Sequence, residues 1–176
     1  MHRANAAASA ATPVQTALKV KTMREPVLAY IGLGANLGDA RGAVLSAMEA
    51  ISDLDLLVLT RKSALYGSAP IDAGGADYVN AVVQVQTRLK PHALLEQLQG
   101  IERVAGRSRS FRNAPRTLDL DVLLYGQLEL SDTLLVLPHP RMWQRAFVLR
   151  PLSDIAPELV SAAQLQAVAE QSVWVL

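Results

Sequence analysis

The sequence predicts an α+β fold in which helices pack on an antiparallel sheet, with additions at the C-terminal end. Three observations indicate it: short apolar runs of strand character, two segments with apolar residues at helical spacing, and the way these alternate along the chain. The predicted order is strand, helix, strand, strand, helix, strand, the split βαβ pattern of ferredoxin-like folds. We therefore expect a ferredoxin-like βαββαβ domain whose two helices cover one face of the sheet.

The first half of that pattern begins at the apolar run 27–33, which predicts a buried strand. Asp39 can cap the helix that follows, because its carboxylate can accept a hydrogen bond from a backbone N–H of the first turn. Apolar residues then recur at helical spacing at Val44, Leu45, Met48 and Ile51. Residues 56–66 and 78–87 are predicted as two strands joined by a long loop rather than by a tight hairpin turn.

The second half begins with a helix over 91–106, opened by a proline and closed by a glycine. Residues 118–125 are predicted as the fourth strand, and 127–130 are expected to return beside it. A helical turn is expected over 145–152. The segment from residue 162 onward has no pattern that assigns it to a helix or a strand.

The chain is expected to contain one catalytic domain, residues 27–176, after a flexible extension over residues 1–26. The extension is rich in alanine and threonine and shows no strand pattern. A secretory signal would need a compact apolar stretch, and here polar residues and a proline interrupt the alanines. No apolar run approaches the roughly 20 residues of a membrane span. We expect a monomer in the cytoplasm that does not bind a membrane.

Composition limits the chemistry of any metal site and the class of partner. The chain has no cysteine, so a metal would have to be held by carboxylates, imidazoles or carbonyls, which favours hard ions such as Mg²⁺. Lys and Arg total 17 against 16 Asp and Glu, giving a net charge of +1. This balance lacks the strong positive field of a dedicated nucleic-acid binder.

Two aspartates at alternate positions of the fourth predicted strand are candidate metal ligands. Residues two apart on a strand face the same side, so Asp119 and Asp121 can present two carboxylates to one surface. Their repulsion is tolerable when a divalent cation lies between them. For an isolated Asp-x-Asp, two solvated aspartates at the end of a strand are the commoner explanation.

The residues around this pair favour a bound polyphosphate. Five arginines precede it, Arg103, Arg107, Arg109, Arg112 and Arg116. Guanidinium groups make planar, bidentate contacts with phosphate. A solvated basic loop explains the arginines alone equally well. Together, the carboxylates and the cations indicate a magnesium-dependent enzyme that transfers a phosphate-containing group from ATP.

Several further side chains could complete such a site, although each alone is more often structural. His139 lies between two prolines that restrict the turn around it. Arg145 and Phe147 offer a cation and a ring. Tyr78 and Asn80 alternate on a strand, where they could supply a stacking surface and an amide that reads donor and acceptor groups.

Two nucleotide-binding motifs are excluded. The glycines of residues 32–38 follow a strand and precede a helix, but their spacing is one residue too long for the dinucleotide fingerprint. The chain also lacks the Gly-x-x-x-x-Gly-Lys-Ser/Thr sequence of a P-loop.

Taken together, the motifs of residues 27–160 resemble the 6-hydroxymethyl-7,8-dihydropterin pyrophosphokinases of folate biosynthesis. The most specific is the run from Pro115 to Asp121, Pro-Arg-Thr-Leu-Asp-Leu-Asp, followed by Pro138-His139. The other matching pieces are Tyr30 to Gly38, Asp77 to Ala81, Gly106 to Arg109, Pro138 to Met142 and Ala156 to Leu159.

The resemblance implies that the β,γ-diphosphate of ATP is transferred to the hydroxymethyl group of the pterin with two Mg²⁺ ions, releasing AMP. It implies metal binding by Asp119 and Asp121, with Arg107 and Arg116 joining them as catalytic residues. The implied ATP contacts are Leu95, Gln99, Glu102, Arg107, Arg109, Arg116, Val122, His139 and Arg145. The implied pterin contacts are Ser68, Ala69, Ile71, Tyr78, Asn80 and Phe147.

The chain departs from some members before the Pro-Arg-Thr run, where Asn113 and Ala114 stand in place of a tryptophan and a glycine. Phe111 is the candidate ring to close over the pterin instead. Two other functions remain open from the residues themselves: an RNA-binding sheet, against which the 5% aromatic content argues, and a magnesium phosphodiesterase with water as the nucleophile.

Overall fold

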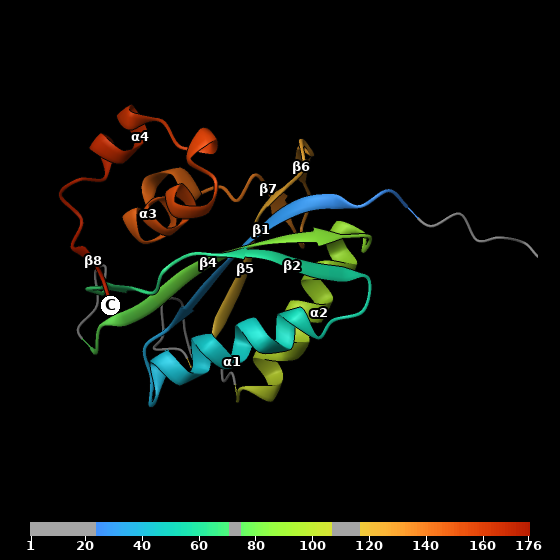
Figure 1. Ribbon diagram of the computed structural model, residues 1–176, viewed down its shortest axis with the longest axis horizontal. Helices are drawn as coiled ribbons and strands as arrows, with labels where there is room; N and C mark the ends of the chain where they lie inside the picture. The colour runs from blue at the N-terminus through green and yellow to red at the C-terminus, as the bar shows by residue number, and fades with distance from the viewer. Residues whose placement is uncertain (1–23, 71–74, 107–116) are drawn as a thin grey trace, which may run out of the picture.

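The computed structural model describes residues 24–70, 75–106 and 117–176 and places six strands in one antiparallel sheet (Figure 1). The strands are β1 (Val27–Ala35), β2 (Leu57–Lys62), β3 (Tyr66–Ser68), β4 (Tyr78–Thr87), β5 (Asp119–Tyr125) and β8 (Val173–Val175). Their order is β5-β1-β4-β3-β8, and β2 pairs with the other half of β4. The predicted ferredoxin-like core is confirmed, with β2 and β3 together in the place of its second strand.

Two helices, α1 (Ala40–Ser52) and α2 (Pro91–Val104), pack side by side on one face of the sheet, as the sequence predicts (Figure 1). Asp39 caps α1 as expected, since its Oδ1 accepts a hydrogen bond from the N–H of Gly42 at 2.9 Å. Pro91 begins α2, where the missing N–H costs no intrahelical bond. Gly106 follows α2 with a φ of +79°, a backbone conformation that favours glycine.

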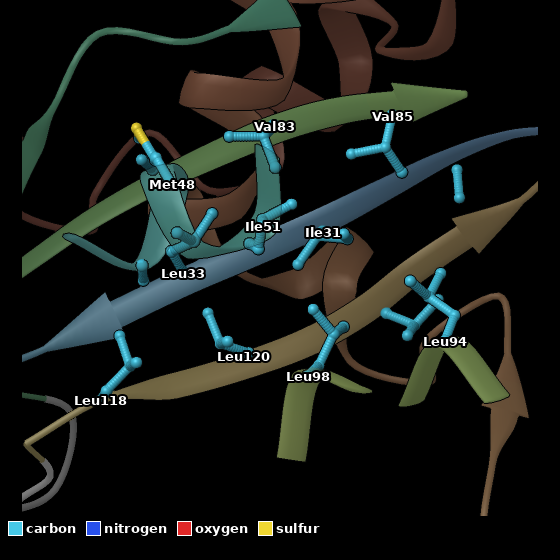
Figure 2. Packing of buried hydrophobic residues seen from close by; sticks show 14 of the residues in the cluster. Ile31, Leu33, Met48, Ile51, Val83, Val85, Leu94, Leu98, Leu118 and Leu120 are labelled. Atoms are coloured by element: carbon cyan, nitrogen blue, oxygen red, sulfur yellow. The ribbon is translucent and has the colours of Figure 1, made fainter. Parts of the chain in front are cut away.

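The main core lies between these helices and the sheet. Strand alternation places Ile31 and Leu33 of β1 toward α1 and α2, where they pack with Ile51 of α1 and Leu98 of α2 (Figure 2). Ile31 is completely buried. Burying such a side chain contributes roughly 1.5–3 kcal/mol relative to leaving it exposed. The opposite residues of β1, including Gly32, face the other side of the sheet.

A third layer covers part of that other side. The helix α3 (Ala146–Ile155) packs on β4, and a second apolar cluster joins Val82 and Leu123 of the sheet to Leu149 and Leu152 of α3. The 3₁₀ turns η1 (Met142–Gln144) and η2 (Pro157–Leu159) and the helix α4 (Ala162–Ala167) complete this layer (Figure 1). The C-terminal additions therefore form a cover over the sheet face that α1 and α2 leave open.

Three details differ from the sequence prediction. The segment 56–66 is interrupted at Ser63, whose hydroxyl accepts a hydrogen bond from the N–H of Val82 at 3.0 Å. The prediction that 127–130 returns beside β5 is wrong. Instead β6 (Leu130–Ser131) pairs with β7 (Val136–Leu137) in a separate two-stranded sheet. The helix expected over 145–152 runs from Ala146 to Ile155.

The unassigned segment from residue 162 contributes both α4 and β8. Most of the predicted N-terminal extension, residues 1–23, lies outside the described residues. In the part of the chain that the structure describes, no helix has the length and apolar character to cross a bilayer.

Candidate functional site

A cavity of about 410 Å³ lies on the sheet face that α3 and η1 partly cover. Residues of β1, β3, β4 and β5 contribute from the sheet, and residues of η1 and α3 from the layer above it. Its lining combines Gly32, Leu33, Gly34, Ser68, Ala69, Pro70, Tyr78, Asn80, Ala81, Asp119, Asp121, Leu123, Arg141, Gln144, Arg145, Phe147 and Val148.

Two glycines of the central strand β1 leave space at the bottom of this cavity, because they have no side chain. Gly32 pairs with Asp121, and Gly34 pairs with Asp119 on one side and Asn80 on the other. A Cβ on Gly34 would lie 3.4 Å from Asn80 Oδ1, close to the polar groups of the neighbouring strand. The glycines excluded above as a dinucleotide motif therefore leave space between the carboxylates of β5 and the amide of β4.

The two aspartates of β5 both line the cavity, whereas Leu120 between them is buried on the opposite face. The alternation expected from the sequence is therefore present. Asp121 keeps 43% of its side chain exposed, so a ligand can reach its oxygens.

This donor set fits Mg²⁺, which is commonly bound by one or two carboxylates together with water and substrate phosphates. Across residues 24–70, 75–106 and 117–176, no group of three His, Cys, Asp or Glu side chains gathers as a metal site. A Mg²⁺ ion held by Asp119 and Asp121 could take further ligands from water and phosphate oxygens.

His139 lies beside the aspartates, with its Nε2 4.0 Å from Asp121 Oδ2. Burial lowers its pKa below the usual value, and the charges of Arg145 and Arg141 lower it further, while Asp121 and Asp119 oppose the shift. The lowered pKa favours the neutral form of the ring. Its Nδ1 accepts the N–H of Arg141 at 3.3 Å, so in the neutral form Nε2 carries the proton, on the side of the ring that faces Asp121.

The other end of the cavity is formed by β3 and β4 together with Phe147 of α3. Asn80 is buried, and its Nδ2 donates hydrogen bonds to Ser68 Oγ at 2.9 Å and to the Tyr66 carbonyl at 3.4 Å. These bonds fix the amide so that Oδ1 is presented as an acceptor. The Arg145 guanidinium lies 5.3 Å from the centre of the Phe147 ring, a cation–π contact.

Most of the described residues expected in the site are thus brought together around one cavity. Ser68, Ala69, Tyr78, Asn80, Asp119, Asp121, Arg145 and Phe147 line it, and His139 lies against Asp121. Ile71, Arg107, Arg109 and Arg116, and the candidate ring Phe111, lie outside the described residues.

Four residues that the resemblance places at ATP lie elsewhere, on the side of the sheet that α2 covers. Leu95 packs against the main core, and Gln99 is half-buried on the same helix. Glu102 is only 2% exposed, and its Oε1 accepts the N–H of Leu120 at 2.8 Å. Val122 is also 2% exposed and belongs to the main core.

Sequence reasoning missed nine residues of the lining: Gly32, Leu33, Gly34, Pro70, Ala81, Leu123, Arg141, Gln144 and Val148. Two signals could have indicated Gly32, Gly34 and Arg141. Glycines at alternate positions of one strand leave one face bare, and Arg141 follows His139 at a spacing that a turn brings to the same side.

The comparisons with known proteins agree with this geometry. Residues 30–157 match the family described as 7,8-dihydro-6-hydroxymethylpterin-pyrophosphokinase (HPPK). The chain is 45% identical over 133 residues to a 2-amino-4-hydroxy-6-hydroxymethyldihydropteridine pyrophosphokinase of Pseudomonas aeruginosa, covering 74% of this chain and 81% of the relative. It is 43% identical to the protein of the same name from Methylorubrum extorquens, covering 75% of this chain and 84% of the relative.

A solved structure of a Plasmodium falciparum HPPK-DHPS with pteroate has a similar fold, with a TM-score of 0.60 at 15% sequence identity. The similarity covers 81% of this chain and 42% of that one, so it supports the fold alone. The family match covers most of the chain and includes β1, β4, β5 and η1, which shape the cavity. The chain therefore belongs to the 7,8-dihydro-6-hydroxymethylpterin-pyrophosphokinase family of enzymes.

Proposed function

We propose that this enzyme transfers the β,γ-diphosphate of ATP to the hydroxymethyl oxygen of 6-hydroxymethyl-7,8-dihydropterin and releases AMP. One observation carries the proposal: a single cavity holds two carboxylates at one end and an aromatic ring with a buried amide at the other. The pathway is folate synthesis, and a relative from Arabidopsis thaliana is named a folate synthesis bifunctional protein.

At the carboxylate end, Asp119 and Asp121 would hold two Mg²⁺ ions. When bound, these ions would neutralise phosphate charge and help to align the reacting groups. The aspartates approach from alternate positions of a rigid strand, so their carboxylates are directed into the cavity with little loss of conformational freedom.

The pterin would occupy the end formed by Asn80 and Phe147. Oδ1 of Asn80 can accept a hydrogen bond from an amino group or ring N–H, because its Nδ2 is already held by Ser68. Phe147 and Tyr78 supply aromatic surface for a flat heterocycle. The hydroxymethyl group would then point along the sheet toward Asp119 and Asp121.

The triphosphate would lie between the pterin and the edge of the sheet formed by β5. Arg145 supplies a cation inside the cavity, and the neutral His139 supplies an N–H donor beside Asp121. Arg107, Arg109 and Arg116 are proposed to add further cations. Such donors stabilise the charge that develops on the transferred group, and the alcohol attacks directly without a covalent enzyme intermediate.

We also propose that the enzyme acts as a cytoplasmic monomer.

The test is to incubate the protein with ATP, Mg²⁺ and 6-hydroxymethyl-7,8-dihydropterin and to identify both products. AMP and the pterin diphosphate are expected in equal amounts. ADP as the nucleotide product would contradict diphosphate transfer. Turnover of a phosphodiester with no pterin present would indicate hydrolysis instead.

A further inference from the structure

The side chain of Gln171 bridges the backbone on both sides of Arg145. Its Nε2 donates a hydrogen bond to the Gln144 carbonyl at 2.9 Å, and its Oε1 accepts the N–H of Ala146 at 2.8 Å. Gln171 lies after α4 and does not line the cavity. One side chain from a distant segment thus holds the two peptide groups that flank a cavity residue.

These two hydrogen bonds satisfy backbone groups where η1 meets α3. Arg145 is a single extended residue, with φ of −125° and ψ of 113°, between the turn η1 and the helix α3. It is the N-cap of α3 but makes no side-chain capping bond. The first N–H groups of a helix have no intrahelical partner, and Gln171 supplies one for Ala146.

The position of this bridge matters because Arg145 and Phe147 both enter the cavity from here. The extended conformation of Arg145 determines where its side chain leaves the backbone. The start of α3 determines where Phe147 points, two residues later. The guanidinium and the ring then contact each other at 5.3 Å, so a shift of the backbone between them would move both groups.

We propose that Gln171 is a positioning residue for the transfer reaction, acting on ATP through Arg145 and on the pterin through Phe147. The proposal rests on the function proposed above. Gln171 touches neither substrate. Its side-chain amide makes the hydrogen bonds that a neighbouring peptide group would otherwise make, and so holds the junction of η1 and α3 in the conformation that both ligands require.

The first experiment compares Gln171→Ala with wild type and with Gln166→Ala. Gln166 is exposed on the adjacent helix and provides a matched loss of an amide. Because Gln171→Ala removes two neutral hydrogen bonds at the junction, we expect KM to rise about tenfold for both substrates. The Gln166 variant should match wild type. Unchanged KM values for both substrates in folded Gln171→Ala would overturn the proposal.

Gln171→Glu provides a second variant of nearly the same shape. It keeps an acceptor for the Ala146 N–H and loses the donor to Gln144, so it should fold and give a smaller rise in KM than the alanine variant. If the glutamate variant is indistinguishable from wild type while Gln171→Ala merely lowers the melting temperature, Gln171 has only a structural role.

A double-mutant cycle separates positioning from general stability. In an Arg145→Ala background, Gln171→Ala should have a much smaller effect on the KM for ATP, because the group it positions is gone. Fully additive effects would contradict the proposal. If wild type forms no AMP, the proposed function itself fails; if wild type is active and the cycle is additive, only the role of Gln171 fails.

Discussion

The hydroxyl of Tyr66 lies 2.9 and 3.0 Å from the two carboxylate oxygens of Asp154. This contact joins β3, which carries Ser68, to α3, which carries Phe147, so it links two sides of the cavity. Burial raises the pKa of Tyr66 to about 12, and the hydrogen bond and charge of Asp154 act in the same direction, while Arg150 opposes them.

This shift predicts a loss of stability in strong alkali. A tyrosine whose pKa is higher in the folded state than in the unfolded state stabilises the fold below the unfolded value of 10.0, and the contribution is lost as the pH rises toward about 12. Tyr66→Phe should lower the free energy of unfolding by about 1 kcal/mol at pH 8. The variant should also lose less stability than wild type between pH 8 and pH 11. Urea unfolding at the two pH values would measure this difference.

Asp154→Asn is the companion variant, because it keeps an acceptor for the phenol but removes the charge. We expect a smaller alkaline loss than in wild type and near-normal stability at pH 8. An alkaline loss of the same size in wild type and Tyr66→Phe would show that another group is responsible.

Asp119→Asn and Asp121→Asn should each lower kcat/KM by a thousandfold or more, equivalent to roughly 4 kcal/mol of transition-state stabilisation. Each substitution removes a carboxylate from the proposed metal site while preserving shape. Cooperative thermal unfolding should persist in both. Asp55→Asn, at an exposed turn position, is the control for loss of one negative charge. Loss of folding in both site variants would assign the pair a structural role.

Substitutions of Glu102 test whether its carboxylate has a structural role or contacts ATP. Glu102→Ala leaves the N–H of Leu120 without the acceptor at 2.8 Å and should destabilise the fold by about 1–3 kcal/mol. Glu102→Gln keeps an acceptor and should remain close to wild type in KM for ATP. A large rise in that KM in the folded glutamine variant would instead support the contact with ATP implied by the resemblance.

The close approach of Trp174 to Gly67 predicts the effect of a single methyl group. A Cβ at position 67 would lie 2.3 Å from the indole ring, so Gly67→Ala must displace the Trp174 side chain or bend β3. We expect a loss of about 1–3 kcal/mol of stability and a higher KM for the pterin, since Ser68 follows on the same strand.

Removing the indole should relieve that overlap. The double variant Gly67→Ala with Trp174→Ala should therefore have a lower KM for the pterin than Gly67→Ala alone. A double variant no better than the single one would locate the strain in β3 itself rather than against the ring.

The sequence was sufficient to predict the ferredoxin-like core, because its signals are local. Ile31 and Leu33 alternate with glycines, Asp39 caps a helix, and Pro91 begins one. Strand alternation also predicts correctly that Asp119 and Asp121 share a face. Periodicity and capping depend on neighbouring residues, so both can be read without knowing the tertiary structure.

Contacts between distant segments could not be predicted in the same way. The strand β8 has only three residues and exists by pairing with β3, and the Ser63 hydroxyl interrupts a strand only because Val82 lies opposite. Glu102 resembles a surface residue in the sequence, yet its carboxylate is buried against Leu120. Its burial follows from how α2 packs against the edge of the sheet.

The pairing of β3 with β8 also makes one wall of the cavity depend on residues made late in protein synthesis. The strands that carry Asn80, Asp119 and Asp121 are made well before residues 173–175, which hold β3 from its outer side. Because a domain generally folds as a unit, the wall that carries Ser68 lacks its outer partner until β8 has been made.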